Sequence, residues 1–540
     1  MCRTISIHEK TKEELARVER LLLRGELKEA LQSVEILESS EMTLEEQLTC
    51  TLLKSKLMVK QGKFKEAIEI AEQALRKIQL TGEKLREVDA FLVISEALWR
   101  AGKVDEGLAY SIRIEKALSS ITGKRSEEIT ERKGELMHHK GIIYRRKGEV
   151  DRPLKFLEQS LEYRRMLGNK HGIGESLNSI GVIYFYKGDL NRALEYYRES
   201  LETKEELGNK QQIAITLNNI GDVYKTKGEL DRALEYFLQC NALLEETTGN
   251  KEHISASLHN IGNVYHNKGN FDRALEYLEK ALELGMELGN KIFIAETLYF
   301  LVQVAIDKKD QILGQRYLQQ LLETSEQMDN KLVNQYYQVA RALLLKANKR
   351  LRDKIEAAEL LDDVIRGAII DHGVTVTAML HSCELFLIEL QITGEEELFA
   401  DIKKMGTRLL EIAKQQASHS LLAETYLLLS RLSLMELNIQ RATRMLTQAR
   451  LIAEERGLEK LTVTIAHEED LLSTQLERWK LIIDQKPDLK EITRLTQINE
   501  LIGRMIHKRV YMDEKEILEY VTMAKQLLKA WEKTKNHNIT

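Results

Sequence analysis

Histidines are the first residues whose type and spacing could do chemistry. His259 and His266 lie seven positions apart, on one face of a predicted helix, with Asn263 between them. Imidazole is a common zinc ligand, but no cysteine or acidic cluster beside this pair completes a ligand set. His138 and His139 are adjacent, and adjacent side chains on a helix point apart. The sequence therefore predicts neither a metal site nor a cofactor.

Catalytic motifs are missing from the sequence. It has no phosphate-binding G-x-x-x-x-G-K-[ST] loop, no G-x-S-x-G nucleophile turn, no H-E-x-x-H helix and no paired C-x-x-C. Four cysteines stand far apart, as is typical of reduced thiols in a cytoplasmic protein: Cys2, Cys50, Cys240 and Cys383. We expect a non-enzymatic protein. A catalytic site assembled from residues far apart in the sequence is the alternative that stays open.

Composition limits the classes of partner. Charged side chains make up 31% of the 540 residues, yet the formal net charge is only -5, whereas a general nucleic-acid binder has a basic excess. No apolar run is long enough to span a bilayer, and the N-terminus lacks the apolar core of a secretory signal. The content of only two prolines favours an almost wholly helical fold. We expect a cytoplasmic protein that binds neither nucleic acid nor membrane.

A period of about forty residues must position any functional site. Gly181, Gly221 and Gly262 lie 40 and 41 residues apart, within the segments IGVIYFYKGDLNRALEYY, IGDVYKTKGELDRALEYF and IGNVYHNKGNFDRALEYL. A second series of glycines marks predicted turns: Gly25, Gly62, Gly102, Gly148, Gly188, Gly228 and Gly269. An alanine follows five residues after several of these turns: Ala30, Ala67, Ala193, Ala233 and Ala274. A fixed period of this length predicts stacked copies of one small unit that cannot bury its apolar face alone.

Each unit is predicted to be a helical hairpin. Leu177, Ile180, Gly181 and Tyr184 recur at i, i+3, i+4 and i+7, so they share one face of a first helix. A turn at 187–189 follows, and a second apolar stripe at helical spacing then runs to the next linker. The hairpin therefore buries one stripe of each helix against the other.

A glycine inside a helix needs a compensating contact. Gly181 costs roughly 1 kcal/mol relative to alanine, so we expect the second helix to approach closely there, with the small Ala193 opposite it. The predicted core consists of aromatic residues on the facing sides of the two helices: Tyr184, Tyr197, Tyr224, Phe237 and Tyr265.

These residues carry a family resemblance. The pattern Leu177…Ile180-Gly181…Tyr184…Gly188…Ala193…Tyr197 resembles the tetratricopeptide repeat. The Leu-Gly-Asn-Lys linkers at 167–170 and 207–210 are similar to those of its longer version, which occurs in kinesin light chains, Pins-LGN-type adaptors and archaeal and bacterial arrays. The resemblance implies an all-α fold, a right-handed superhelical solenoid of antiparallel helix hairpins with about eleven repeats.

The regularity of the repeat divides the chain. The predicted segments are degenerate repeats at 1–120, a regular array at 121–330, degenerate repeats at 331–470 and a C-terminal helical cap at 471–540. The spacing between successive turn glycines is longer around Gly123 than elsewhere, which suggests a joint between the first two segments. After Gly269 the turn glycine is lost, and Lys309 stands in its slot. A separate small helical domain is the alternative for the last segment.

The resemblance also implies which residues bind a partner. In tetratricopeptide proteins the first helix of each hairpin lines the concave face, and here that assigns partner-binding positions to five successive first helices. These positions are His138, Arg145, Arg146, Asn178, Phe185, Tyr186, Asn218, Asp222, Lys225, His259, Asn263, His266, Asn267, Tyr299 and Gln303. The carboxamides of Asn178 and Asn218 offer donors and an acceptor that suit the backbone of an extended peptide.

The remaining side chains of this set suggest the partner's chemistry. Arg145, Arg146 and Lys225 favour acidic side chains or a terminal carboxylate, and Phe185 and Tyr186 suit an apolar anchor. The alternative interpretation is that these residues have no binding role, because asparagine, histidine and arginine are common on the solvent-exposed face of any helical hairpin.

Three functions compete. The first is an adaptor or scaffold that holds peptide segments of partner proteins in the concave groove. The second is a regulatory sensor of a peptide or other ligand, although no effector module is recognisable in the sequence. The third, an RNA-binding solenoid, conflicts with the acidic balance of charge. Self-association through an end unit is possible.

Overall fold

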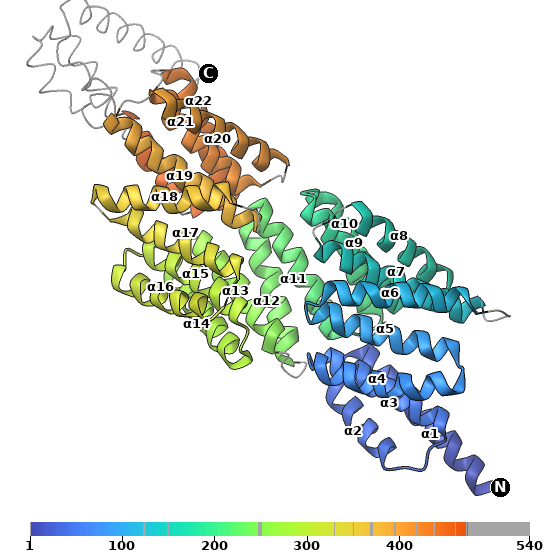
Figure 1. The fold of residues 1–540 in the computed structure, drawn as a ribbon. Helices are drawn as coiled ribbons and strands as arrows, with labels where there is room; N and C mark the ends of the chain where they lie inside the picture. The colour runs from blue at the N-terminus through green and yellow to red at the C-terminus, as the bar shows by residue number, and fades with distance from the viewer. Residues whose placement is uncertain are drawn as a thin grey trace, which may run out of the picture. The chain divides into compact units, whose positions relative to one another are not determined.

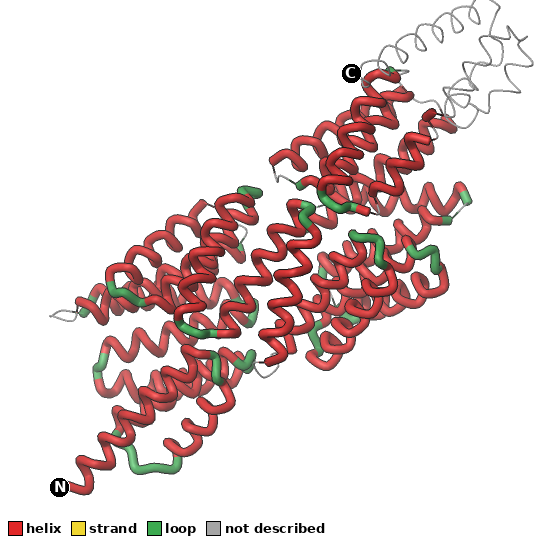
Figure 2. Tube along the Cα trace, turned by 180° about the vertical axis from the view of Figure 1, so that it is seen from behind, coloured by secondary structure: helices red, strands yellow, loops and turns green. Residues whose placement is uncertain are grey.

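The structure is a computed structural model that describes residues 2–473, except 122–125, 148, 150, 247–250, 329, 349, 368–370, 394–395, 416–417, 436–437, 460 and 471. These residues form helices, turns and loops, and no strand occurs among them (Figures 1 and 2). The helices are α1 (Cys2–Arg24), α2 (Leu27–Glu38), α3 (Leu44–Lys60), α4 (Phe64–Thr81), α5 (Lys84–Arg100), α6 (Val104–Ser119), α7 (Ser126–Arg146), α8 (Asp151–Met166), α9 (Lys170–Tyr186), α10 (Leu190–Glu206), α11 (Lys210–Lys227), α12 (Leu230–Glu246), α13 (Lys251–Asn267), α14 (Phe271–Leu288), α15 (Lys291–Asp307), α16 (Gln311–Glu326), α17 (Lys331–Ala347), α18 (Leu351–Arg366), α19 (His372–Thr393), α20 (Glu396–Gln415), α21 (His419–Met435) and α22 (Ile439–Glu455).

The chain divides into two compact units. Unit 1 comprises Met1–Val223 and Gln239–Asn250, and unit 2 comprises Tyr224–Leu238 and Lys251–Thr540. Within each unit an odd-numbered helix pairs with the even-numbered helix that follows it, and it also contacts the odd-numbered helices of the neighbouring hairpins. In unit 1 the layer of first helices is α1, α3, α5, α7 and α9. The predicted all-α solenoid of stacked hairpins is confirmed.

The predicted segment boundaries stay predictions. Gly123, the predicted joint, and residues 474–540, which make up most of the predicted C-terminal cap, lie outside the described residues.

The turns inside the hairpins share one backbone conformation. The turn glycines adopt positive φ values, for example 76° at Gly188 and 75° at Gly269. Lys309 keeps this conformation with φ 64°, and among the described residues it is the only one other than glycine with a positive φ. The left-handed turn is therefore kept at Lys309, although the glycine that favours this conformation is absent there. This explains why the repeat stays in phase beyond Gly269.

The mid-helix glycines make room for a large side chain. A Cβ added to Gly181 would lie 2.6 Å from Cε1 of Tyr197, and one added to Gly262 would lie 2.7 Å from Cγ of Leu278. The predicted close approach is therefore present, but the residue opposite Gly181 is Tyr197 and not Ala193. The small alanine is itself fully buried. The glycine allows the bulkier side chain to fill the space between the two helices.

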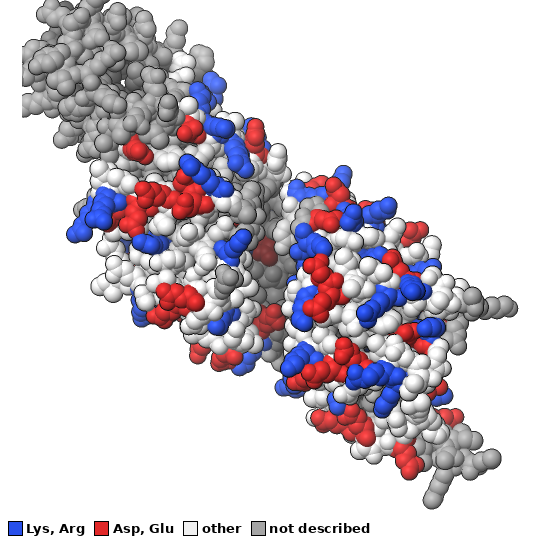
Figure 3. Space-filling view, in the orientation of Figure 1, with Lys and Arg blue, Asp and Glu red and all other residues white. Residues whose placement is uncertain are grey.

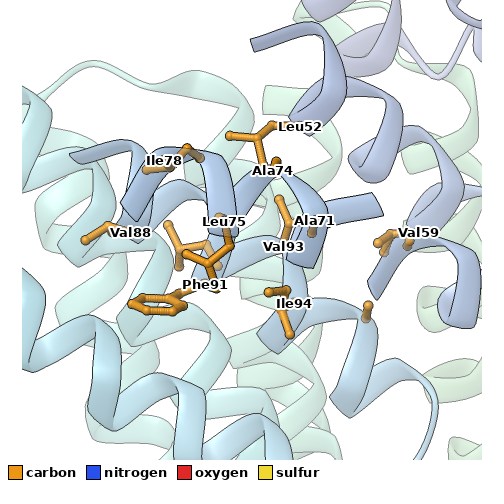
Figure 4. Packing of buried hydrophobic residues seen from close by; sticks show 14 of the residues in the cluster. Leu52, Val59, Ala71, Ala74, Leu75, Ile78, Val88, Phe91, Val93 and Ile94 are labelled. Carbon is orange, nitrogen blue, oxygen red and sulfur yellow. The ribbon is translucent and has the colours of Figure 1, made fainter. Parts of the chain in front are cut away.

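The core runs along the facing sides of the helices. In unit 1 a cluster on α3, α4 and α5 packs Leu52, Ala71, Leu75, Val88 and Phe91 together (Figure 4). Aliphatic side chains from three successive helices interdigitate there, which joins one hairpin to the next.

The predicted aromatic core is mostly buried. Tyr197, Tyr224, Phe237 and Tyr265 are buried, whereas Tyr184 is half-buried. Tyr184 stacks on Tyr196 of the second helix, with ring centroids 5.4 Å apart. The predicted full burial of Tyr184 was therefore wrong, because its ring lies at the edge of the hairpin and not inside it.

This edge contact recurs as a three-layer stack. The Arg192 guanidinium lies 5.5 Å from the Tyr184 ring centroid, on the ring that stacks on Tyr196. Three other hairpins repeat the arrangement of arginine, tyrosine and aromatic ring: Arg152–Tyr144–Phe156, Arg232–Tyr224–Tyr236 and Arg273–Tyr265–Tyr277. Cation–π and aromatic stacking together favour one fixed approach of the two helices.

Charges of both signs are mixed on the surface. On the face shown in Figure 3, lysine and arginine side chains alternate with aspartate and glutamate over both units. Many pairs link neighbouring hairpins at a fixed spacing, such as Lys187–Asp151 at 2.7 Å in unit 1 and Lys308–Asp272 at 2.6 Å in unit 2. Exposed pairs of this kind add little stability. No described helix has the length and apolar composition needed to cross a membrane.

Each unit also makes contacts between distant hairpins. In unit 1 the Asn209 side-chain amide donates to the Leu23 carbonyl, 186 residues away in sequence. In unit 2 Arg456 pairs with Glu229 at 3.5 Å, and Lys268 approaches Glu459 at 3.7 Å. The hairpins of each unit therefore curve back until the start of the stack contacts its later part.

Candidate functional site

The layer of first helices in unit 1 encloses a polar pocket of about 260 Å³. Its walls come from α1, α3, α5 and α7, from the end of α8 with the linker that follows it, and from the start of α9. Charged side chains dominate the lining: the acids Glu19, Glu96, Glu131, Glu135 and Glu175, and the bases Lys56, Lys60, Arg100 and Arg164. Three leucines and an isoleucine supply the apolar part: Leu22, Leu23, Leu53 and Ile142. No group of three or more potential metal ligands occurs among the described residues.

One part of the pocket is acidic. Burial raises the pKa of Glu131, and the nearby Glu135 and Glu19 raise it further despite the opposing effect of Arg132. Lys56 stands among these carboxylates. Burial would lower its pKa, but the surrounding acids raise it. Glu19 and Glu135 form no ion pair with any described residue. This part of the pocket, which we call the acidic pole (Glu19, Glu131 and Glu135), therefore carries more negative charge than Lys56 neutralises.

Another part of the pocket is basic. Arg100 lies over the ring of Trp99 at 4.8 Å, and Arg146 lies over the same ring at 5.2 Å. Arg100 is paired with Glu96 at 2.8 Å, whereas Lys60 and Arg146 form no ion pair with any described residue. Burial lowers the pKa of Arg146, and the charges of Arg145 and Arg100 lower it further. We call Lys60 and Arg100, which line the pocket, together with the exposed Arg146 beside it, the basic pole.

The basic pole follows the repeat. Ser55 and Ser95 each donate a hydrogen bond to a carbonyl twelve residues later, in the second helix of their hairpin, and Gly141 holds the same place against the Pro153 carbonyl. Counting five residues on from these three positions gives Lys60, Arg100 and Arg146. Three successive hairpins therefore present a base at one equivalent position, and the neighbouring helices set the spacing between them.

Two ring nitrogens in the pocket wall have no partner. Trp99 is 5% exposed and His139 is 4% exposed, and both line the pocket. Trp99 Nε1 and His139 Nδ1 form no hydrogen bond. Burial lowers the pKa of His139 although Glu96 opposes the shift, so its imidazole is neutral at pH 7. Buried polar atoms are rarely left unsatisfied, and these two are enclosed within the wall, with almost no accessible surface.

The far wall of the pocket is a satisfied network. Arg164 donates to the Gly172 carbonyl at 2.7 Å and to Ser176 Oγ at 2.9 Å, and it approaches Glu175 at 3.4 Å. A Cβ on Gly172 would lie 2.6 Å from Cδ of Arg164. The glycine therefore lets the buried arginine cross to α9. This network holds α8 against α9 and supports the pocket wall.

Eight of the predicted partner-binding residues lie in unit 1. His138 lines the pocket, and its Nε2 is 3.0 Å from Ser179 Oγ. Burial lowers its pKa well below the usual value, so it is neutral at pH 7. Arg146 lies against Trp99 in the wall, as described, and Arg145 lies 5.9 Å from the ring centroid of Tyr186. His138 and the two arginines thus all lie in the C-terminal half of α7.

The other predicted residues of unit 1 contact side chains of their own helix or of the neighbouring first helix. Phe185 and Tyr186 meet edge to face at 6.0 Å, and Tyr186 is 65% exposed. Asn178 accepts a hydrogen bond from the Asn219 amide at 3.0 Å. Asn218 donates to Asp222 at 3.3 Å on the same helix. These side chains are not part of the pocket.

The seven predicted residues of unit 2 are mostly held by neighbouring helices. His259 is buried against Phe293 and Phe300, with its Nδ1 3.2 Å from Thr297 Oγ1. Burial lowers the pKa of His259 to about 3, and Lys225 adds to the shift.

The other members of this group vary in exposure. Lys225 donates to Asn260 at 3.1 Å, and His266 Nε2 lies 2.6 Å from Asp307. Asn263 and Tyr299 are buried and Asn267 is exposed. Gln303 is half-buried, and its Nε2 has no hydrogen-bond partner among the described residues.

Most of the pocket residues are not among the predicted partner-binding positions. Those positions lie only on the regular repeats, from His138 onward. In the two preceding hairpins Lys60 and Arg100 occupy the repeat position that is equivalent to Arg146. Assigning equivalent positions in those hairpins as well would therefore have identified them. Glu19 and Trp99 gave no comparable signal, because the first hairpins lack the glycine pattern of the regular array. Glu131 and Glu135 lie on α7 before His138, the first position that the resemblance assigned.

Comparisons with known proteins agree with this architecture. A family model described as the MalT-like TPR region matches residues 174–463, and a tetratricopeptide repeat model matches residues 133–206. No curated protein matches the chain. Among solved structures, the apo form of the quorum sensor NprR from B. thuringiensis is 13% identical, with 67% of this chain and 99% of that chain covered and a TM-score of 0.52.

Two further solved structures are more distant in shape. A signal transduction ATPase with a tetratricopeptide repeat sensor from Pyrococcus horikoshii is 15% identical, with 62% of this chain and 52% of that chain covered and a TM-score of 0.46. Aspartyl phosphate phosphatase F from Bacillus subtilis is 11% identical, with 78% and 97% covered and a TM-score of 0.42. At 13% sequence identity, the similarity to NprR shows a common fold.

Proposed function

The chain belongs to the MalT-like tetratricopeptide-repeat family, and on that premise we propose that it is a non-enzymatic cytoplasmic adaptor. It holds extended peptide segments of partner proteins along the first helices of its hairpins. The family supports a role in protein interaction. The observation that carries the proposal is the polar wall of unit 1, where first helices from successive hairpins present charged groups and the rings of Trp99 and His139 to one pocket.

The mechanism is recognition by a surface that is already formed. Stacked hairpins hold each first helix in place, so binding costs little ordering of the receptor. Asn178 and Asn218 suit backbone groups of the bound segment, and Arg145 and Arg146 suit its acidic groups. Each hairpin adds a modest contribution, and affinity grows with the number of hairpins that a segment reaches.

The test uses a displayed library of linear peptides selected on the full-length protein. We expect enrichment of peptides that lose about tenfold in affinity on the variant Arg145→Gln/Arg146→Gln, because charge-assisted contacts are worth about 1–3 kcal/mol. The matched control is Arg76→Gln/Lys77→Gln, which neutralises two adjacent exposed bases on the second helix α4. Failure of any linear peptide to enrich above the starting pool would contradict the proposal, as would equal losses in the two variants.

A second candidate is a peptide- or ligand-sensing regulator. The observation that favours it is the contact between Asn209 and Leu23, which joins the first hairpin to a distant linker and gives unit 1 a joint that a ligand could open or close. The solved relative NprR is described as a quorum sensor. A ligand-dependent change in the radius of gyration, measured by solution scattering, would favour the sensor, and an unchanged radius would favour the adaptor.

A further inference from the structure

The charges of the unit 1 pocket are separated along its walls. On α7 one helix face carries the pocket residues Glu131, Glu135, His139 and Ile142 in turn. Arg146 follows one turn later, exposed beside the pocket and against the ring of Trp99. The acidic residues of this face belong to the acidic pole and the arginine to the basic pole. With about 1.5 Å of rise per residue, Glu135 and Arg146 are roughly 17 Å apart along the helix.

Neither pole is fully neutralised by the protein itself. Glu19 and Glu135 form no ion pair with a described residue, and the contact of Glu131 with Arg132 is long, at 3.9 Å. At the other end Arg100 pairs with Glu96, and Lys60 lowers the pKa of Glu96 and of Glu175, whereas Arg146 forms no ion pair with a described residue. Charges of one sign that outnumber their partners disfavour the empty state and favour a ligand of the opposite sign.

The region between the poles is suited to a chain with few charges. Leu22, Leu53 and Ile142 supply apolar surface to the pocket, and Ile142 lies between Glu135 and Arg146 along α7. The rings of Trp99 and His139 also line the pocket. An extended peptide advances by about 3.3 Å per residue, so roughly five residues span the 17 Å between the poles.

From this arrangement we propose that unit 1 selects dipolar peptide segments, with a cationic group at the acidic pole and a carboxylate at the basic pole about five residues away. The inference rests on the proposed function and adds the charge pattern of the ligand. Both the two ends of a free short peptide and two opposite side chains within a longer protein supply this pattern.

The probes are three pools of hexapeptides with the same uncharged, mixed apolar middle and with acetyl and amide blocked ends. The first pool has lysine at one end and glutamate at the other, in both orders so that either chain direction is available. The second has lysine at both ends, and the third has glutamate at both ends. We expect the mixed pool to bind the full-length protein about tenfold more tightly than either like-charge pool.

Charge reversal of each pole tests the assignment of residues. The variant Glu131→Lys/Glu135→Lys should come to prefer the glutamate pool, and Lys60→Glu/Arg146→Glu should come to prefer the lysine pool. The control Glu202→Lys/Glu205→Lys reverses two exposed acids on α10 and should keep the preference for the mixed pool. The two reversals predict opposite outcomes, so either one alone tests the inference if the other variant unfolds, as judged by circular dichroism.

Two outcomes separate this inference from the proposed function. Binding of all three pools with equal affinity, or reversals that leave the preference unchanged, would overturn the dipolar site and leave peptide binding intact. Absence of binding by any pool would count against both. An uncharged hexapeptide with free ends identifies the source: tight binding indicates free peptides, and binding of only the blocked mixed pool indicates segments within a longer chain.

Discussion

At the scale of single residues, burial decides the chemistry of the polar side chains on the first helices. His259 has the residue type of a ligand, yet its ring is enclosed by Phe293, Phe300 and Thr297. Its low pKa follows from that enclosure, because a charged imidazole would lose its hydration, and the Glu296 carboxylate 3.9 Å from its Nε2 does not offset this loss. His139 is equally buried but lines a pocket, and one of its nitrogens has no partner.

The pKa of His259 predicts a pH-dependent stability. The unfolded chain titrates this group near the usual 6.5 and the folded chain near about 3. Between these values the unfolded state binds more protons, so the free energy of unfolding falls as the pH falls. The slope from one such group is at most about 1.4 kcal/mol per pH unit.

The measurement is urea unfolding of the full-length protein at pH 7 and pH 5. The variant His259→Gln should lose less stability between the two pH values than the parent does. His467→Gln, at an exposed position, is the control and should behave like the parent. If His259→Gln shows the parent's full loss of stability, the imidazole is not held neutral in the folded state.

At the scale of elements, the hairpin is fixed by a left-handed turn and by a close approach of two helices. The turn tolerates the loss of its glycine at Lys309, at an energetic cost, because an L side chain with φ 64° crowds the backbone. The close approach does not tolerate such a loss as readily, since a Cβ at Gly181 would overlap the Tyr197 ring. Overpacking of this kind costs about 1–3 kcal/mol.

The Lys309 turn yields a prediction at this scale. Lys309→Gly should stabilise the protein by about 0.5–1 kcal/mol, because the relief of strain exceeds the added flexibility of the unfolded chain. Lys308→Gly is the matched control. Lys308 has φ -69° and pairs with Asp272, so its replacement should destabilise. Thermal unfolding of both variants decides the point, and equal effects would show that the turn at Lys309 is unstrained.

At the scale of the molecule, each unit is a stack whose distant hairpins meet. In unit 1 Asn209 has two roles. Its Oδ1 accepts a hydrogen bond from the backbone N–H of Gln212 and so caps α11, and its Nδ2 donates to the backbone carbonyl of Leu23. Asn169 caps α9 in the same way, through the Gly172 amide, but has no partner in the first hairpin. One linker asparagine thus joins local and distant structure, because the stack curves back at that linker.

This difference allows a matched test of the closing contact. Asn209→Asp keeps the capping oxygen and removes the donor to Leu23, so amide hydrogen exchange in α1 and α2 should become faster while α7 to α9 stay protected. Asn169→Asp makes the same change of chemistry at a linker without the distant contact. It should leave exchange in the first hairpin unaltered. Unchanged exchange in Asn209→Asp would mean that the contact does not hold the hairpin in place.

The sequence by itself determined the hairpin, its turn and its register. These depend on residues within one period, such as Gly181 with Tyr184 and the turn before Leu190, and local spacing encodes them directly. It also placed Arg145 and Arg146 on a first helix. It misjudged the residue opposite Gly181, because the depth at which two helices interlock depends on side-chain volumes on both of them.

Only the tertiary structure decided which polar side chains are available. Whether a first-helix histidine faces a pocket or a neighbouring ring depends on a helix forty or more residues away, as His139 and His259 illustrate. The poles of the unit 1 pocket combine α1, α3, α5 and α7, and the closing contact joins residues 186 apart. Such juxtapositions follow from the curvature of the whole stack, and no local spacing in the sequence specifies that curvature.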